Sequence, residues 1–456
     1  MRSLSLRFLL APVTLAGVGV LAACRADDST APGTSFSQSN AALAAEVRQL
    51  AAGRGITPLA PPPVVRPALV RLGQALAFDK LLSGNRDISC MSCHLPKFAT
   101  GDGLSLSIGQ GGVGLGPDRT HPQGVFIARN APAAFNLHAV RPLFWDGRVF
   151  QDPAGTMHTP ANARLTPAMT AVFEFGTLSA QPLFPVLSRA EMRGGGGNEL
   201  AAFADDQETE IWAAIMRRLG AIPEYRVMFE RAYPGQRFED MTIAHASNAI
   251  AGFLVSSLGF NDSPWDRFLA GNDRALSDVQ LAGAKNFMSA RCSICHNGPA
   301  FTDNQFHNVA VAQIGPGAGD GPDGHDDFGH MRVTGLATDR YAFRTTPLRN
   351  VELTGPWGHD GAFTDLRAFV DHYSESALKI HSYDVNQLAP NLRGTLQPTA
   401  DAILATRDPL LEGVVFTPQQ IDEVTEFLRA LTDPRARNLE PVTPGHVPSG
   451  LPIDRP

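Results

Sequence analysis

Two pentapeptides constrain this chain more than any other feature: Cys90–His94 (CMSCH) and Cys292–His296 (CSICH). Each places two cysteines one helical turn apart and directly before a histidine. That is the spacing at which c-type haem is attached, with two thioethers to the porphyrin and the histidine on the iron. Zinc sites and redox dithiols are the alternatives, but zinc ribbons hold their Cys pairs only about 15–20 residues apart. The predicted haem-binding residues are Cys90, Cys93, His94, Cys292, Cys295 and His296.

Helical patterns precede both motifs. Leu69, Leu72 and Leu76 recur at helical spacing before the first, and Ser277 with Gln280 has capping-box spacing before the second. No strand pattern stands out. Because 456 residues exceed one usual compact core and the helix–loop–motif order occurs twice, we predict a mainly α protein with two related haem domains and long loops.

The N-terminus has the form of an export signal. Arg2 and Arg7 precede a short apolar run, Phe8–Val20, and the run ends in Leu21–Cys24, which resembles a bacterial lipobox. The lipobox implies cleavage before Cys24 and lipidation of its sulfur. The expected parts of the chain are a signal peptide of lipoprotein type at 1–23, a flexible tether at 24–66, an N-terminal haem domain at 67–276, a C-terminal haem domain at 277–436 and an irregular tail at 437–456.

An ordinary signal peptide with an incidental cysteine is the alternative, whereas a membrane span needs about 20 apolar residues, more than this run offers. Loss of the leader removes two positive charges and takes the net charge from −7 to −9. No basic block suits nucleic acid, and the mildly acidic balance is explained by solubility. We expect a periplasmic protein anchored to the membrane through lipidated Cys24, and a homodimer is left open.

A helical stripe follows the second motif. Leu366, Phe369, Val370 and Tyr373 share one face of a helix that Thr364 is expected to cap. A buried tyrosine needs a partner for its oxygen. From periodicity alone, a core tyrosine bonded to a backbone carbonyl is favoured.

Short motifs in a fixed order resemble the bacterial di-haem cytochrome c peroxidase/MauG family, over roughly residues 65–435. The resemblance implies two cytochrome c-like helical domains with their haems on facing sides. The motifs are Leu82–Asn85, Arg129–Pro132, Phe144–Arg148, Gln181 with Glu191, Pro347–Asn350 and His359–Gly361.

The same resemblance implies an iron ligand at Tyr373. Family peroxidases carry a methionine at this interval after the histidine that matches His359, and MauG-type members carry a tyrosine. A phenolate is a hard anionic donor that favours the higher iron oxidation states, whereas methionine raises the haem potential.

The resemblance also implies an open site at haem 1. Gln110 stands where classical members place a displaceable histidine, and His121 is the alternative ligand. Glu191 and Gln181 match the distal pair that handles peroxide, with water-facing loop residues as the alternative. The stretch 150–180 is longer than in classical members, which implies either an added lid or an altered access to haem 1.

Trp145 resembles the family tryptophan between the haems, with an ordinary core tryptophan as the alternative. Asn130, Thr354 and Pro356 resemble an inter-haem calcium site with oxygen ligands. The expected function is therefore reduction of hydrogen peroxide, with electrons from a small cytochrome c or a cupredoxin. MauG-like oxidation of Trp or Tyr in a partner protein and non-catalytic electron transfer are the alternatives.

Overall fold

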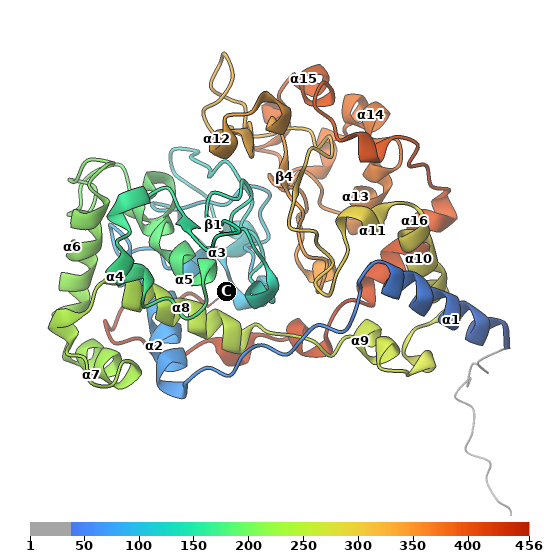
Figure 1. Cartoon of the computed structure of the whole chain (residues 1–456). Helices are drawn as coiled ribbons and strands as arrows, with labels where there is room; N and C mark the ends of the chain where they lie inside the picture. The colour runs from blue at the N-terminus through green and yellow to red at the C-terminus, as the bar shows by residue number, and fades with distance from the viewer. Residues whose placement is uncertain (1–37, 456) are drawn as a thin grey trace, which may run out of the picture. The chain divides into compact units, whose positions relative to one another are not determined.

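Helices joined by long irregular segments build the protein (Figure 1). A computed structural model describes residues 38–455, so Cys24 and the rest of the leader lie outside it. The helices are α1 (Gln38–Gly53), α2 (Pro67–Phe78), α3 (Cys90–Cys93), α4 (Pro167–Thr170), α5 (Thr177–Ala180), α6 (Glu208–Gly220), α7 (Pro223–Ala232), α8 (Ile243–Ser257), α9 (Pro264–Leu269), α10 (Asp278–Ser289), α11 (Cys292–Cys295), α12 (Met331–Thr334), α13 (Leu366–Tyr373), α14 (Ser376–Lys379), α15 (Ala400–Leu404) and α16 (Pro418–Arg429).

Strands are few and short. The described residues form two antiparallel ribbons of two-residue strands, in which Phe150 lies opposite His158 and Phe306 lies opposite Arg344. Within residues 38–455, no helix combines the length and apolar character that crossing a bilayer requires. The strands are β1 (Phe150–Gln151), β2 (Met157–His158), β3 (Phe306–His307) and β4 (Phe343–Arg344).

One close helix crossing occurs in each half of the chain. A Cβ on Gly73 of α2 would lie 1.8 Å from the carbonyl oxygen of Ala249 in α8, and a Cβ on Gly283 of α10 would lie 1.8 Å from that of Glu423 in α16. Only glycine lets the backbones of each pair approach this closely. The helices α2 and α10 are also the ones that lead to the two haem motifs (Figure 1). From this repetition we infer two related haem-binding halves, 67–276 and 277–436.

The crossing of α10 and α16 can be tested through Gly283. Gly283→Ala is expected to lower the free energy of unfolding by about 1–3 kcal/mol, because the backbone of α16 has to shift to admit the methyl group. Gly394→Ala is the control, since its added Cβ would meet no atom within 4 Å. Denaturant unfolding of the holoprotein, followed by circular dichroism, measures the difference. Equal stability of the two variants would contradict the tight crossing.

One predicted helix start agrees with the structure and one differs. Ser277 caps α10 within a capping box as expected, and Thr417 caps α16 in the same way. At α13 the cap is Asp365 rather than Thr364: the Asp365 carboxylate accepts a hydrogen bond from the backbone N–H of Ala368 at 2.8 Å. A carboxylate at this position also complements the positive end of the helix dipole.

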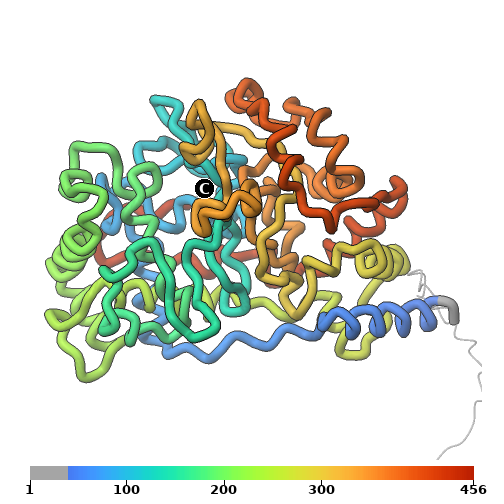
Figure 2. The backbone as a smooth tube through the Cα atoms, turned by 45° about the horizontal axis from the view of Figure 1, so that its top comes forward, coloured from blue at the N-terminus to red at the C-terminus, as the bar shows by residue number. Residues whose placement is uncertain are grey.

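The flexible tether predicted for 24–66 is wrong over its second part. Residues 38–53 form α1, whose Ala44, Val47 and Ala51 are fully buried. Glu46 of α1 pairs with Lys285 of α10 at 2.9 Å, and Figure 2 shows α1 beside this helix. The polar residues run into the first turn of α1, as Gln38, Ser39 and Asn40, and the alanines and valine that follow bury an apolar side.

The C-terminal tail, residues 437–455 of the described chain, contains one short 3-10 turn at Glu440–Val442. It nevertheless packs back onto the first half of the chain. Asp454 forms an ion pair with Lys80 at 2.5 Å and accepts a hydrogen bond from Ser92, within the first haem motif. Sequence periodicity could not reveal this docking, because it depends on two polar contacts far apart in the chain.

The long stretch 150–180 forms the β1–β2 ribbon and the short helices α4 and α5. It is tied to α8 through Asn248, whose side chain accepts a hydrogen bond from the Glu174 backbone N–H at 2.8 Å. Leu178, near the end of the stretch, lines a cavity that also contains the first haem motif. The insertion therefore contributes to the wall of that site.

Candidate functional site

Two adjoining cavities contain the predicted site residues. The first cavity is lined by the Cys90–His94 motif and the second by the Cys292–His296 motif, with empty volumes of about 1760 and 1870 Å³ that include their mouths. Asn130, Trp145 and Arg344 border both. Residues from both halves of the chain thus form the wall between the two motifs.

The motif histidines are held in the tautomer that a metal ligand needs. His94 donates its Nδ1–H to the carbonyl oxygen of Thr100 at 2.8 Å, and His296 does the same to Phe301 at 3.0 Å. Nε2 is then left with a free lone pair. Burial lowers the pKa of both imidazoles, which keeps them neutral. The sulfur-bearing residues of the two motifs border the same cavities: Cys90 and Cys93 the first, Cys292 and Cys295 the second.

Tyr373 borders the second cavity together with the other residues of its helical stripe. Leu366 and Val370 are buried as expected, but Phe369 and Tyr373 are only half-buried because they face the cavity rather than packed core. In the part of the chain that the structure describes, no protein group is hydrogen-bonded to the Tyr373 hydroxyl, which removes support for a core tyrosine bonded to a carbonyl. Burial raises the pKa of this phenol, so a phenolate here requires a compensating cation.

Glu191 and Gln181 border the first cavity, where His94 also lies. Glu191 sits in a single π-helical turn, Arg189–Arg193, a local distortion often found at functional positions. Burial raises the pKa of the Glu191 carboxyl, against the opposing effect of the Arg148 guanidinium. A carboxyl group with a raised pKa in a cavity can both accept and return a proton near neutral pH.

The side chains of Gln110 and His121 do not line the first cavity. Gln110 packs against Gly194, where an added Cβ would lie 2.5 Å from its Nε2. His121 packs against Gly111 and accepts a hydrogen bond from the Gln123 backbone N–H at 3.1 Å. The alternative in which His121 ligates haem 1 therefore gains no support from the structure.

Trp145 is fixed in the wall between the cavities. Its indole N–H donates to the Asn130 carbonyl oxygen at 2.9 Å, and its own carbonyl accepts from the Arg344 backbone N–H at 2.9 Å. Asn130, Thr354 and Pro356 all border the second cavity beside it. The side-chain amide nitrogen of Asn130 donates to the carbonyl oxygens of Leu104 and Ser105, at 2.8 and 3.2 Å. Its amide oxygen therefore points away from these two carbonyls.

Arg344 is a site residue that sequence reasoning missed. Its side chain is buried, borders both cavities and, among residues 38–455, has no carboxylate partner. Burial lowers its pKa to about 10. A desolvated guanidinium of this kind needs an anion, and the propionates of a haem would provide one. No local pattern signals this role, since the desolvation depends on segments remote in sequence.

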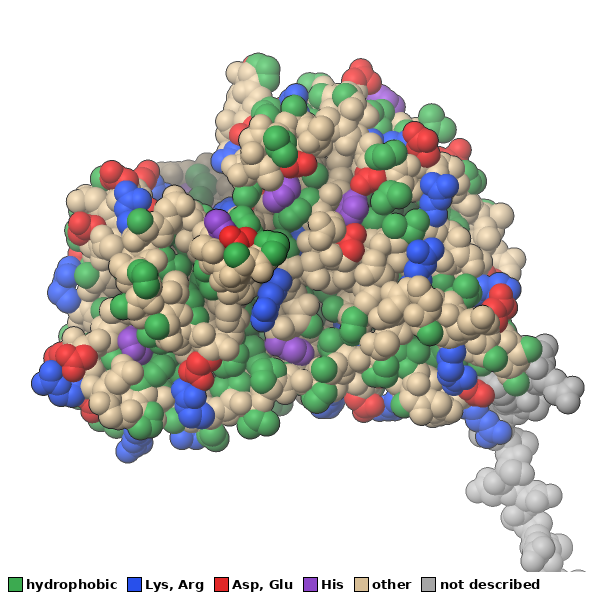
Figure 3. Space-filling view, in the orientation of Figure 1, with side chains coloured by type: hydrophobic (Ala, Val, Ile, Leu, Met, Phe, Trp, Pro, Cys, Tyr) green, Lys and Arg blue, Asp and Glu red, His purple; other side chains and the backbone are tan. Residues whose placement is uncertain are grey.

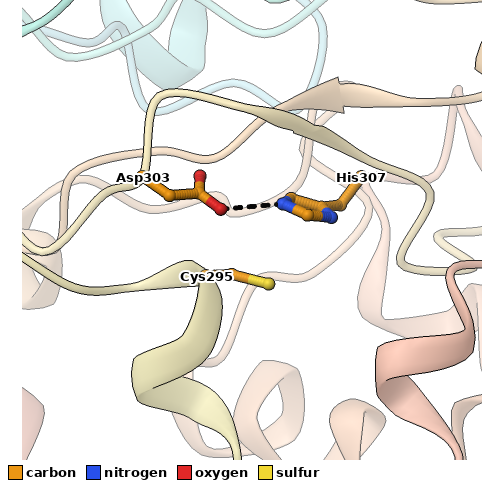
Figure 4. A group of neighbouring side chains, drawn as sticks. All are labelled: Cys295, Asp303 and His307. Atoms are coloured by element: carbon orange, nitrogen blue, oxygen red, sulfur yellow. Dashed lines mark hydrogen bonds and ion pairs between the residues drawn. The ribbon is translucent and has the colours of Figure 1, made fainter. Parts of the chain in front are cut away.

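Cys295, Asp303 and His307 form a cluster at the second cavity whose donor atoms lie within 4.8 Å of one another (Figure 4). His307 lies between Asp303, at 2.9 Å, and Asp408, at 2.5 Å. Burial lowers the pKa of His307, but the bonds to Asp303, Cys295 and Asp408 outweigh it and raise the pKa to about 11. A protonated imidazole is no metal ligand, and Cys295 is needed for a thioether. We therefore interpret the cluster as an ion-paired support of the cavity.

The fold and the two cavities define a helical protein built to hold two haem c groups, with a carboxylate at one and a tyrosine at the other. A sequence profile of the family described as "Di-haem cytochrome c peroxidase" matches residues 67–274. Cytochrome c551 peroxidase of Pseudomonas aeruginosa is 31% identical over 298 residues, 65% of this chain and 68% of that protein. The chain belongs to the di-haem cytochrome c peroxidase family, and membership implies two haem c groups.

Other relatives include both kinds of protein that the sequence suggested. The methylamine utilization protein MauG of Methylorubrum extorquens is 29% identical over 314 residues, 69% of this chain and 70% of that one. The crystal structure of a MauG-like protein associated with microbial copper homeostasis has a TM-score of 0.59 at 24% identity, covering 85% of this chain and 96% of the other. The diheme peroxidase BthA of Burkholderia thailandensis has a TM-score of 0.56 at 22% identity, covering 86% and 91%. These two structures support the fold.

Proposed function

We propose that this chain is a di-haem c peroxidase that reduces hydrogen peroxide in the first cavity, with electrons relayed through the second from a small cytochrome c or a cupredoxin. The observation that carries the proposal is the placement of Glu191 in the same cavity as His94. A bound haem c supplies the redox chemistry that cleaves the peroxide. The chain's own residues supply binding, orientation and proton movement.

Glu191 moves the proton. Its carboxylate accepts a proton from one peroxide oxygen and returns it to the other, so that water can leave. The Gln181 amide, which borders the same cavity, orients peroxide by hydrogen bonding. Arg148 borders this cavity as well, and its positive charge lowers the pKa of Glu191 against the larger effect of burial.

Trp145 connects the two cavities. Its ring borders both, and the bond to Asn130 fixes its orientation. An indole is among the most easily oxidised side chains and can carry an electron between macrocycles that do not touch. Asn130, Thr354 and Pro356 are proposed to bind calcium next to it through one amide and two backbone oxygens.

A MauG-like activity, peroxide-dependent oxidation of Trp or Tyr residues in a partner protein, is the second candidate. Tyr373 in the second cavity favours it. A phenolate ligand stabilises the higher oxidation states of iron, so such a haem would hold an oxidising equivalent better than it would hold an electron. Gln110 favours it too. Because glutamine stands where classical members have a displaceable histidine, no ligand has to be released by reduction before peroxide can bind at haem 1.

Peroxide assays of the holoprotein separate these functions. We expect addition of peroxide to change the Soret spectrum and to drive oxidation of a reduced small cytochrome or cupredoxin. Mass analysis of co-purified exported proteins would detect oxidised Trp or Tyr if the second candidate holds. Two six-coordinate haems with no spectral response to peroxide would instead make the chain a non-catalytic electron carrier and refute both proposals.

We further propose that the protein works in the periplasm, held to the membrane through lipidated Cys24. The apolar run before Cys24 and the need to attach haem c after export support this location. On the face in Figure 3, acidic and basic side chains are interspersed. The homodimer stays a prediction from sequence.

A further inference from the structure

Tyr341 borders the second cavity, and its hydroxyl is bonded to a carboxylate. The hydroxyl donates to Oδ2 of Asp326 at 3.2 Å, and Arg340 donates its Nη2–H to the phenolic oxygen at 2.9 Å. Tyr341 is 3% exposed and Asp326 is 6% exposed. Asp326 belongs to the Gly315–Gly329 loop, which lies next to α12 (Figure 1). Tyr341 thus borders the cavity, and its hydroxyl has a proton acceptor.

The structure describes all five tyrosines of the chain. Only one of them both borders the second cavity and has its hydroxyl bonded to a carboxylate. Tyr225 is bonded to the Asp79 carboxylate at 2.7 Å but borders neither cavity. Tyr233 and Tyr383 donate to backbone carbonyl oxygens, and Tyr373 is the proposed iron ligand. Proximity to the second cavity and a carboxylate partner coincide at Tyr341 alone.

The backbone at Tyr341 is strained as well. Its φ is 62°, in the left-handed region that a bulky side chain rarely adopts. A backbone hydrogen bond from its N–H to the Phe328 carbonyl oxygen, at 3.0 Å, helps to hold this conformation. Strain of this kind persists where the surroundings determine the position of a side chain, and functional sites are where it concentrates.

We propose that Tyr341 is a one-electron relay for oxidising equivalents in the second cavity, with Asp326 as its proton acceptor. The inference rests on the proposed reaction with hydrogen peroxide, which is the oxidant. Tyr341 gives one electron to the haem bound in the cavity; its O–H bond breaks, and the proton forms a new O–H bond on the Asp326 carboxylate. A neutral tyrosyl radical and a neutral carboxylic acid result. An electron from the donor or protein substrate, with the proton from Asp326, restores the phenol.

Arg340 suits both states of this pair. It forms an ion pair with Asp326 at 3.5 Å, and its bond to the phenolic oxygen remains after the proton has left. Burial, and then the negative charge of Asp326, raises the pKa of Tyr341 to about 12. The phenol is therefore protonated at neutral pH, and losing an electron requires losing the proton too.

Freeze-quench EPR of the holoprotein mixed with hydrogen peroxide tests the relay. We expect a tyrosyl radical signal that narrows when the protein contains ring-deuterated tyrosine and that is lost in Tyr341→Phe. Asp326→Asn keeps the tyrosine but removes the proton acceptor, so the signal should form roughly 100-fold more slowly. Tyr225→Phe, which breaks the same kind of tyrosine–carboxylate bond away from both cavities, should leave it unchanged.

The outcomes separate this inference from the proposed function. If peroxide changes the Soret spectrum but the radical is absent from the wild type, or is equally strong in Tyr341→Phe, the relay is wrong and the peroxide reaction stands. If peroxide leaves the Soret spectrum unaltered, the proposed function fails and the relay fails with it. Haem staining and circular dichroism confirm that each variant is loaded and folded.

Discussion

Glu191→Gln is expected to slow the reaction of the holoprotein with hydrogen peroxide by roughly 100- to 10,000-fold, the usual contribution of a positioned acid–base group. Glutamine has nearly the same shape as glutamate but cannot accept a proton, so peroxide can still enter while the proton transfer is lost. Stopped-flow recording of the Soret band gives the rate constant. Glu210→Gln, which changes an exposed carboxylate in α6, serves as control.

The pH dependence gives the same prediction a second test. Burial raises the pKa of Glu191, so its carboxylate, the form that accepts the proton, is lost as the pH falls through this raised value. The wild-type rate constant should therefore fall on the acid side, and Glu191→Gln should lack that dependence. If Glu191→Gln kept the wild-type rate constant and the same fall of that constant at low pH, Glu191 would be excluded as the proton carrier.

Tyr373→Met is expected to raise the reduction potential of the haem in the second cavity by roughly 0.2–0.5 V, within the span of about 0.8 V that axial ligands command. A phenolate stabilises the oxidised iron through its negative charge, and a neutral thioether does not. Spectroelectrochemical titration of the holoprotein measures the shift. The variant should also become a better electron reservoir and lose its capacity to hold oxidising equivalents.

Two further variants sharpen the ligand assignment. Tyr373→Phe should remove the phenolate signature from the ferric optical and EPR spectra, because phenylalanine has no donor atom. Tyr383→Phe removes a tyrosine whose hydroxyl is bonded to the Ala362 carbonyl oxygen and should leave spectra and potential unchanged. If Tyr373→Phe and Tyr373→Met keep the wild-type spectra and potential, the ligand has to be sought elsewhere in the second cavity.

Much of the site could be predicted from sequence because its chemistry is local. The two thiols and the histidine of each motif lie within one helical turn, so their spacing alone predicts haem attachment. The Ser277 cap acts on a backbone group three residues away, and the structure places the start of α10 there. The stripe ending at Tyr373 follows the helical period.

Other features were decided only by tertiary structure, because they arise where distant segments remove water from one another. Arg344 becomes a desolvated cation between two cavities, and His307, which already faces Asp303 nearby in sequence, gains a second carboxylate partner in Asp408 from a remote segment. No spacing rule contains such information.

The N-terminal segment shows the same difference between what composition predicts and what tertiary packing decides. Composition predicted a tether over 24–66, yet α1 packs on α10 through residues whose partners lie in the other half of the chain. The amino-acid sequence by itself determined the two haem motifs, the helical stripe that ends at Tyr373 and the chemical type of each candidate ligand, since these depend on neighbours along the chain. Only the folded protein decided that Trp145 borders both cavities and that Tyr341 meets Asp326, since burial and pairing depend on neighbours in space.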